Sequence, residues 1–379
     1  MTGAYGAACT AANARILATV EQAYSHSATE LLLNGHRTVE LLDARLVDLD
    51  LATLTAALSE SNPFERIDLS YNELGAGAAS SLAEFLKADS KLQYLDLSHN
   101  DMESSAIEAI CLALKSNTTL REVHLSGNKL GGVGGMAVAE MLQANPSLQA
   151  LHLSNCELTS ESLVALATVL RDDQRLHVLD VSRPLAQTIM DEPAQHFARM
   201  LKVNATLVEL DLSKAGLRDF GLRLLSEEIY RAGAASALSV LRMRCNKIQL
   251  VDADAVDSLS MLLSADTCRL TSLDLGSNEL RDEGALKLAE MVVANRSLVH
   301  LDVTSNGLMS RGLCALAKSV GKHFALDRVM LWGNGFDSAA CYAWKDSLSS
   351  NGDRLELDVE IRVSDRTAAS IQTYHCARR

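Results

Sequence analysis

Leucines and polar residues recur along the chain in a fixed pattern. The segment from Leu92 to Met102 has the form Leu-x-x-Leu-x-Leu-x-x-Asn-x-Met. Leu95 and Leu97 alternate with polar residues, which is typical of a short strand that buries one face and exposes the other. Beyond the asparagine, the apolar spacing changes from two residues to about 3.6. The pattern therefore predicts a strand, a turn and a helix in each copy.

The same pattern repeats along almost the whole chain. Successive copies start 28 to 32 residues apart, and a degenerate copy follows near Leu355. One copy cannot bury its apolar face alone, so the copies must stack on their neighbours. The starts are His36, Phe64, Leu92, Leu120, Leu148, Leu176, Leu207, Leu238, Leu270, Leu298 and Leu326.

An asparagine follows the strand in seven of the eleven copies. Its amide can bond backbone groups of the turn and of the neighbouring copy. Cys156 fills this position once, and Ala44, Pro184 and Ala215 interrupt it. We therefore expect this asparagine ladder to be weakest in the first copy and around copies six and seven. The seven asparagines are Asn72, Asn100, Asn128, Asn246, Asn278, Asn306 and Asn334.

A second asparagine position lies just before a strand. Asn117, Asn204 and Asn295 each begin an Asn-x-Ser/Thr tripeptide there, which matches the glycosylation signal. Because all three occupy the same position of the pattern, we interpret them as turns that end a helix.

The repeats resemble those of leucine-rich repeat proteins of the ribonuclease-inhibitor-like class, which run near 28 residues and carry a full α-helix. The resemblance covers about residues 36–360. It implies an α/β solenoid of horseshoe shape, with a parallel β-sheet on the concave face and α-helices on the convex face. We predict an N-terminal helical cap over residues 1–35, eleven repeats over 36–354, and a capping strand with a polar tail over 355–379.

Both ends carry patterns expected of caps, because terminal repeats would otherwise expose apolar edges. Helical spacing from Ala12 to Leu33 predicts a helix over the N-terminal edge. From Asp353 to Val363, apolar and polar residues alternate strictly, which predicts a final strand. Residues 364–379 are polar, and we expect them to be loosely held.

Composition and charge narrow the classes of function. The 379 residues carry a formal net charge of −13, which argues against a nucleic-acid surface. No apolar run approaches the ~20 residues of a membrane span, and the N-terminus does not resemble a secretory signal. The eight cysteines are scattered singly, with neither CxxC pairs nor a disulfide-rich spacing. We expect a cytoplasmic protein in a reducing compartment.

The residue between the two strand leucines of each copy, such as Asp96 between Leu95 and Leu97, should lie on the exposed sheet face. Across the copies, these residues form a row. Asp96, His124, His152 and Asp180 are consecutive in this row, and imidazoles flanked by carboxylates can bind Zn²⁺. A flat row spreads such side chains along a line, and nothing in the repeat supplies an oxyanion hole or a shielded pocket. We therefore predict no metal, no cofactor and no catalytic residues. Six aspartates of the row, interpreted as polar strand residues, are Asp68, Asp96, Asp180, Asp211, Asp274 and Asp302.

Positive charge interrupts this acidic row. Arg242 and Arg244, with Lys214 diagonal to them, suit the carboxylates of an acidic segment of a partner protein. The three longest repeats lie in the same part of the chain, and insertions in solenoids often mark the binding edge. We predict that the three basic residues contact a protein partner.

Arg328, Met330 and Trp332 form a second group, on the last regular strand. Their residue types are enriched in the cores of protein interfaces. The alternative is that Trp332 packs under the C-terminal cap. We predict that this group also contacts a protein partner.

These features favour a non-enzymatic protein–protein interaction scaffold that works as a subunit of a larger hetero-complex. By analogy, a cytoplasmic, cytoskeletal or flagellar axonemal assembly is the expected location. The resemblance leaves two alternatives open: a GTPase-activating protein of the Ran-activator type, and an inhibitor of a bound enzyme. Sparse aromatic residues on the sheet face disfavour the inhibitor, and the uniform early repeats disfavour the activator.

Overall fold

The computed structural model describes residues 2–26, 28–35, 45–185, 190–363 and 369–373. The chain forms two compact units, Met1–Thr188 and Ile189–Arg379. Each unit alternates short parallel strands with α-helices. The predicted α/β solenoid is thereby confirmed within each unit.

In the described part of the first unit, six strands pair in sequence order, and the pairings are parallel. The strands are β1 (Glu30–Leu32), β2 (Arg66–Asp68), β3 (Tyr94–Asp96), β4 (Glu122–His124), β5 (Ala150–His152) and β6 (Val178–Asp180). The helices are α1 (Thr2–Ala12), α2 (Ala18–Ser25), α3 (Asp48–Glu60), α4 (Ala76–Ala88), α5 (Ser104–Leu114), α6 (Gly131–Ala144) and α7 (Ser160–Leu170).

The described part of the second unit continues the same alternation. Its parallel strands are β7 (Glu209–Asp211), β8 (Val240–Arg242), β9 (Ser272–Asp274), β10 (His300–Asp302), β11 (Arg328–Met330) and β12 (Glu356–Leu357). An antiparallel hairpin follows, made of β13 (Val359–Val363) and β14 (Ala369–Thr373). The helices are α8 (Asp191–Val203), α9 (Arg218–Ala232), α10 (Ala253–Ser264), α11 (Arg281–Ala294), α12 (Ser310–Val320) and α13 (Ser338–Asn351), with short 3₁₀ turns η2 (Gly233–Ala235) and η3 (Gly352–Arg354).

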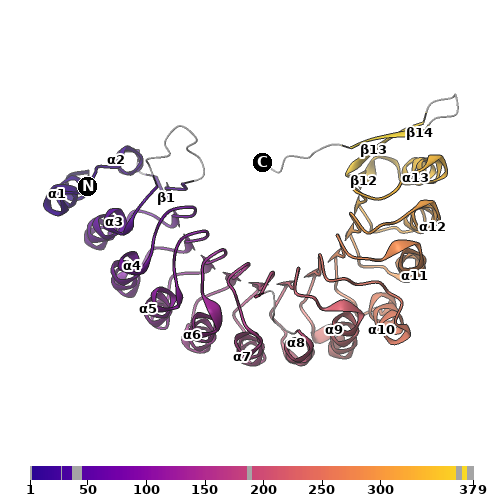
Figure 1. Ribbon diagram of the computed structural model, residues 1–379, viewed down its shortest axis with the longest axis horizontal. Coiled ribbons are helices and arrows are strands. Elements are labelled where there is room, and N and C mark those ends of the chain that lie inside the picture. The colour runs from indigo at the N-terminus through magenta and orange to yellow at the C-terminus, as the bar shows by residue number, and fades with distance from the viewer. Residues whose placement is uncertain (1, 27, 36–44, 186–189, 364–368, 374–379) are drawn as a thin grey trace. The chain divides into compact units, whose positions relative to one another are not determined.

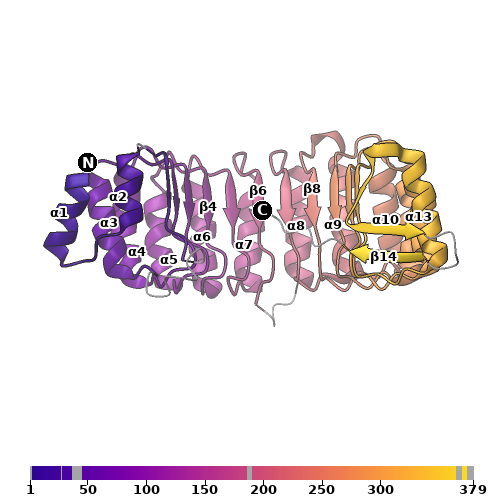
Figure 2. The same cartoon turned by 90° about the horizontal axis from the view of Figure 1, so that it is seen from above.

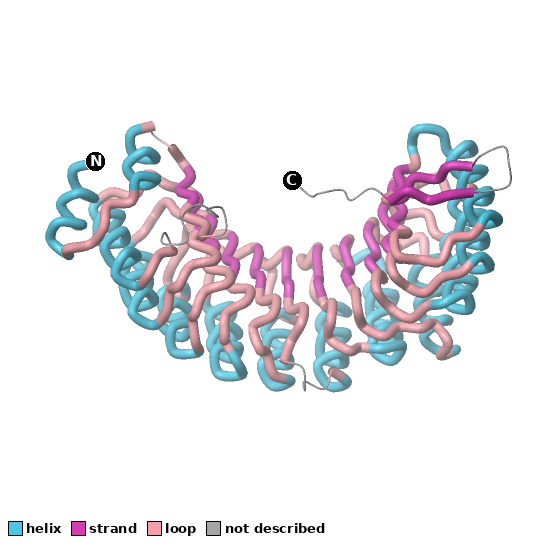
Figure 3. Tube along the Cα trace, turned by 45° about the horizontal axis from the view of Figure 1, so that its top comes forward, coloured by secondary structure: helices cyan, strands magenta, loops and turns pink. Residues whose placement is uncertain are grey.

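Within each unit, the helices lie on one side of the sheet (Figure 1, Figure 3). Figure 2 shows the strands of a unit running side by side. We call the sheet face turned away from the helices the open face. The core lies between the sheet and the helices: Leu95 on β3 and Leu97 just after it are fully buried, and Leu82 and Leu86 are buried on α4. This burial explains why leucine recurs at these positions.

The asparagine ladder is confirmed, because each of the seven predicted amides bonds backbone groups of adjacent repeats. Asn100 is representative: its Nδ2 donates to Leu69 O at 3.0 Å and to Leu97 O at 2.9 Å, and its Oδ1 accepts from Leu74 N at 3.2 Å. Cys156 donates instead through Sγ to Leu125 O at 3.2 Å. The other amides behave alike: Asn72, Asn128, Asn246, Asn278, Asn306 and Asn334.

The predicted interruptions of the ladder have different outcomes. Ala44 lies outside the described residues, as do His36 and Glu40 of the first predicted repeat. Ala215 has no polar side chain, but its backbone N–H donates to Asn246 Oδ1 at 3.0 Å, as the N–H of Asn246 does to Asn278 Oδ1 at 2.7 Å. The backbone part of the ladder is therefore regular at Ala215, and only the side-chain amide is missing.

The second asparagine position is also structural. Asn117 is buried, its Nδ2 donates to Leu86 O at 2.8 Å, and its Oδ1 accepts from Leu120 N at 2.8 Å. Asn204 and Asn295 likewise accept from the backbone N–H three residues on, at 2.8 and 2.7 Å. Their interpretation as turns that end a helix is confirmed.

The predicted helix over Ala12 to Leu33 is wrong at its C-terminal end. Helix α2 ends at Ser25, and Glu30–Leu32 forms strand β1 beside β2. Leu31 is fully buried and lies opposite Ile67. Because β1 pairs with the edge of the sheet, it fills the place that we predicted for the repeat starting at His36.

The predicted single strand from Asp353 to Val363 is divided between two sheets. Strand β12 pairs with β11, whereas β13 pairs with β14. Asp358 lies at the division: its carboxylate accepts from Leu331 N at 2.6 Å and from Trp332 N at 3.1 Å. Because a side chain takes these donors, the parallel backbone pairing stops there. The expectation of a loose polar tail is wrong for Ala369–Thr373, which forms β14. The predicted boundaries between caps and repeats stay predictions.

Candidate functional site on the open sheet faces

Each of the six predicted aspartates of the exposed row accepts a hydrogen bond from the turn that follows its own strand. Asp96 Oδ1 accepts from Ser98 N at 2.8 Å, and Asp302 Oδ1 accepts from Thr304 N at 2.8 Å. In each case, the donor is the backbone N–H two residues further on. These carboxylates therefore have a structural role, which confirms their interpretation as strand residues. The others are Asp68, Asp180, Asp211 and Asp274.

His152 and Arg242 interrupt this arrangement. After His152, the backbone N–H of Ser154 donates to Ser126 Oγ on the neighbouring repeat, at 3.2 Å. After Arg242, the backbone N–H of Arg244 donates to Ser213 Oγ at 3.1 Å. A neighbouring hydroxyl thus replaces the missing carboxylate, so the histidine and arginine side chains are available for other contacts.

In the first unit, four flat side chains lie against one another across strands β2 to β5. The Arg66 guanidinium carbon lies 3.7 Å from the centre of the Tyr94 ring. The Tyr94 ring centre lies 5.1 Å from that of His124, and His124 stacks on His152 at 4.0 Å with an angle of 14° between the rings. Burial raises the pKa of Tyr94, and the negative charges of Asp96 and Glu122 raise it further. The sequence indicated that the two histidines are neighbours but missed Arg66 and Tyr94.

Glu122 joins the two histidines into a compact polar cluster. Its Oε1 lies 2.7 Å from His124 Nε2 and 3.9 Å from His152 Nε2. We call Glu122, His124 and His152 the histidine cluster. The sequence grouped the histidines with Asp96 and Asp180, whose carboxylates bond backbone N–H groups at 2.8 and 2.9 Å. The side chain that the structure places with the histidines is Glu122, two residues before His124 on the same strand face.

In the second unit, the two predicted arginines form ion pairs within the chain. Arg242 pairs with Glu209 on β7. Arg244 Nη1 lies 2.6 Å from Asp302 Oδ2 and 3.2 Å from Asp274 Oδ1, and its Nη2 donates to Thr304 Oγ1 at 2.8 Å. The sequence pattern does not indicate that Arg244 reaches Asp302 on β10.

Partial burial shifts the pKa values of Asp274 and Arg244 in this network. Burial raises the pKa of Asp274 to about 6, with a further rise caused by Asp302; the Gly276 N–H and Arg244 act in the opposite direction. Burial lowers the pKa of Arg244, but the carboxylates of Asp302 and Asp274 raise it more, so the net shift is upward. Arg244 is therefore a permanent cation that faces two carboxylates.

The remaining predicted residues also belong to the second unit. Lys214 is exposed in the turn after β7, at a positive φ of 57°. Arg328 on β11 pairs with Glu356 on β12 at 2.7 Å, and Met330 is half-buried. Trp332 is 44% exposed, so it is not enclosed under a cap.

The two predicted groups share one row of the open face. Strand register places Arg242 opposite Asp274, Asp274 opposite Asp302, and Asp302 opposite Met330. Three strand spacings separate Arg242 from Met330, or roughly 14 Å. A single extended segment of a partner could therefore reach both groups.

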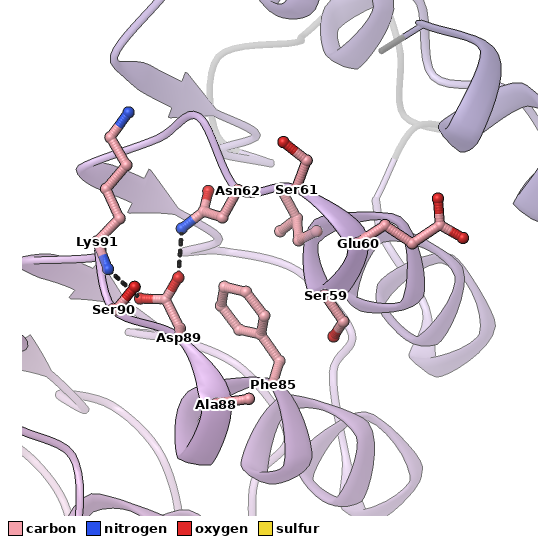
Figure 4. A pocket seen from close by; sticks show the side chains of 10 residues that line it. Ser59, Glu60, Ser61, Asn62, Phe85, Ala88, Asp89, Ser90 and Lys91 are labelled. Carbon is pink, nitrogen blue, oxygen red and sulfur yellow. Dashed lines mark hydrogen bonds between the residues drawn. The ribbon is translucent and has the colours of Figure 1, made fainter.

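Two hollows lie away from the open faces. Figure 4 shows the first, between the turns after α3 and α4, where Asn62 Nδ2 donates to Asp89 Oδ1 at 2.7 Å beside the Phe85 ring. Its volume of about 150 Å³ is below the ~300 Å³ of ordinary ligand pockets. The second, about 390 Å³, is lined by α10, α11 and Leu250–Val251, without histidine, cysteine or hydroxyl side chains. Neither hollow holds a nucleophile paired with a histidine base.

Among the described helices, none has the length and apolar character to cross a membrane.

Known proteins with similar sequences contain leucine-rich repeats. Leucine-rich repeat-containing protein 34 of Mus musculus is 34% identical over 180 residues, which cover 48% of this chain and 41% of the mouse protein. The Rattus norvegicus protein of the same name is 33% identical over 188 residues, covering 49% of this chain and 44% of its own length. The human NACHT, LRR and PYD domains-containing protein 12 is 42% identical over 96 residues, covering 25% of this chain and 8% of that protein. The chain thus spans less than half the length of these relatives.

A solved structure shows the same fold. The leucine-rich repeat-containing protein LegL7 from Legionella pneumophila superposes with a TM-score of 0.50 at 20% sequence identity, over 73% of this chain and 86% of that one. A family model described as "Leucine Rich repeat" matches residues 88–111, 116–139, 144–167, 268–289 and 294–317. The ribonuclease-inhibitor-like subclass stays a prediction from repeat length. The strand–turn–helix repeats, the asparagine ladder and these matches agree: the chain is a leucine-rich repeat protein.

Proposed function

We propose that the protein is a non-enzymatic scaffold that binds one or more proteins on the open face of its second unit. In this proposal it is a subunit of a larger hetero-complex in the cytoplasm, with cytoskeletal and axonemal assemblies as the specific candidates. Solenoids present extended surfaces of this kind to their partners. The observation that carries the proposal is the exposure of Trp332, at 44%, next to Arg328 and Met330.

Trp332 would supply most of the affinity. Large aromatic side chains dominate interface energetics, because they bury much apolar area at a low cost in conformational entropy. The Arg328–Glu356 pair beside it is about half exposed on both partners. Such a surface pair contributes under ~1 kcal/mol, so Arg328 can exchange Glu356 for a carboxylate of the partner.

An acidic partner segment would also meet Lys214 and Arg242. Arg242 is 37% exposed in its pair with Glu209, so a second carboxylate can approach it. Arg244 has a different role in this proposal, because Asp274 and Asp302 already surround its guanidinium group. It would hold the row in place rather than supply the main contact.

Affinity capture from extracts of the source cells tests this function with a matched pair of variants. Trp332→Ala removes the exposed aromatic residue of the open face, whereas Tyr342→Ala removes one on helix α13 that is 48% exposed. We expect Trp332→Ala to lose a discrete set of co-purifying proteins and Tyr342→Ala to retain it, with equal melting temperatures. Loss with Tyr342→Ala alone would move the binding surface to the helices. Capture of one small GTPase would favour the Ran-activator alternative, and capture of one enzyme would favour the inhibitor.

A further inference from the structure

We propose that the histidine cluster binds a transition-metal cation of the zinc type on the open face of the first unit. The three ligands are one carboxylate oxygen of Glu122, one ring nitrogen of His124 and one of His152. All three ligand atoms lie within 4.8 Å of one another. This site is separate from the protein-binding surface proposed for the second unit.

The strand register brings the ligands together. Glu122 and His124 are two residues apart on β4, so their side chains leave the same face of the sheet. His152 on β5 lies directly opposite His124. The residue opposite Glu122 is Ala150, whose side chain is a single methyl group. This small neighbour leaves space between Glu122 and His152 for an ion.

The distances suit a small cation after side-chain adjustment alone. Zinc binds nitrogen and carboxylate oxygen at about 2.0–2.2 Å, so two ligands of a tetrahedral site lie roughly 3.4 Å apart. The observed separations from Glu122 Oε1, 2.7 Å to His124 and 3.9 Å to His152, lie on either side of this value. The His124 and His152 rings are nearly parallel, at 14°, so one imidazole must turn out of the stack before both ring nitrogens can face the same ion. The side chains can make this change without movement of the strands.

Neighbouring side chains hold one ligand, the His124 ring, before an ion arrives. The His124 ring lies between Tyr94, at 5.1 Å, and His152, at 4.0 Å, and Arg66 in turn covers the Tyr94 ring. Outer contacts that fix the ring orientation of a ligating histidine strengthen metal binding. The contact with Tyr94 thus limits the conformational entropy that His124 would lose when the metal binds, whereas His152 has to leave the ring stack to coordinate.

The types of ligand select the class of metal. Imidazole suits zinc, copper and nickel, whereas magnesium and calcium prefer sites made of oxygen atoms. Three protein ligands leave at least one coordination position open. On an exposed sheet face, that position is accessible to water or to a side chain of a bound protein.

Calorimetric titration of the purified, chelator-treated protein with Zn²⁺ tests the site. His152→Ala and Glu122→Gln each remove one ligand. The matched control is His177→Ala, which changes an exposed histidine in the turn before β6. We expect one equivalent of Zn²⁺ to bind to the wild type and to the control with micromolar affinity or better. Each ligand variant should bind at least tenfold more weakly.

Cobalt gives a second readout that ordinary surface binding does not produce. Co²⁺ in a tetrahedral site absorbs visible light strongly, so wild type and His177→Ala should show this band and His152→Ala should lose it. Melting curves of all variants without metal show whether each one folds. Absence of binding to the wild type, or equal binding to His152→Ala, would overturn the proposal. Displacement of Co²⁺ by equimolar Mg²⁺ would contradict the assigned class of metal.

Discussion

The guanidinium group of Arg244 contacts the carboxylate of Asp302 at 2.6 Å, although Arg244 follows β8 and Asp302 ends β10. The arginine side chain therefore crosses β9. Gly276, just after β9, makes this crossing possible, because a Cβ atom at that position would collide with Arg244 Nη1. Asp274 on β9 is the second carboxylate of the network. One cation thus links three consecutive repeats of the second unit.

Asp274→Asn should remove one source of the pH dependence of the free energy of unfolding. The pKa of Asp274 is about 6 in the folded chain, against 3.8 as its ordinary value. Between these values, the unfolded chain releases the proton first, so the free energy of unfolding falls as pH rises from about 4 to about 6 and then levels off. Two units of pKa correspond to about 3 kcal/mol. Urea unfolding of both proteins at intervals from pH 4 to pH 7.5 measures this difference.

Other carboxylates titrate in the same range, so the quantity of interest is the difference between variant and wild type. Asn retains an oxygen that can accept from the Gly276 N–H, which keeps the turn after β9. We expect Asp274→Asn to gain stability relative to wild type as pH rises through this window. Parallel curves for the two proteins would show that Asp274 is not held in a desolvated, like-charged environment.

Asn278→Ala should destabilise the second unit by about 2–4 kcal/mol. Its Nδ2 donates to Met243 O and Leu275 O, both at 2.9 Å, and its Oδ1 accepts from Asn246 N and Ile248 N at 2.7 and 3.1 Å. Alanine leaves these buried backbone groups without their partner. Chemical denaturation monitored by circular dichroism measures the loss.

Cysteine at the same position should be less harmful than alanine. Cys156 shows that a thiol at the ladder position can still donate to the carbonyl of the preceding repeat, at 3.2 Å from Leu125 O. We therefore expect Asn278→Cys to lose less stability than Asn278→Ala by roughly 1 kcal/mol. Equal losses would indicate that packing, and not hydrogen bonding, governs this position.

Truncation of a side chain to alanine should cost more stability on the buried side of the sheet than on the open face. Leu275 is fully buried, and Leu275→Ala should cost about 2–5 kcal/mol. The His124 side chain is 22% exposed on the open face, and its truncation removes the ring contacts with Tyr94 and His152 and the hydrogen bond with Glu122. His124→Ala should therefore cost under about 1.5 kcal/mol. Denaturant midpoints compare the two, and a similar cost for both would be incompatible with the assignment of the open face.

Local pattern predicts most of this fold. From β2 to β11, the strands fall within the predicted copies, because buried leucines alternate over a few residues and the asparagine follows at a fixed distance. The N-terminal strand was missed for the opposite reason. Leu31 and Leu32 also fit a helical spacing, and only their pairing with Ile67 and Asp68 makes them a strand. A three-residue strand at a sheet edge depends on a distant partner.

The candidate site could be predicted only in part. The sequence indicated the row that holds His124 and Arg242, because each interrupts a series of aspartates. Glu122 was missed because it belongs to the adjacent row, and a long flexible side chain brings its carboxylate to the histidines. Arg244 meets Asp302 across 58 residues of sequence, and no local pattern reports such a contact.

Site-specific photo-crosslinking tests the central claim, that the open face of the second unit binds a protein, most directly. A photoreactive phenylalanine derivative is placed at Trp332 and, in a separate variant, at Tyr342 on helix α13. Both positions are nearly half exposed, at 44% and 48%, so the reagent is equally accessible to solvent. After irradiation in extracts of the source cells, we predict a covalent adduct with a partner protein from position 332 and none from position 342. An adduct from position 342 and none from position 332 would contradict the account.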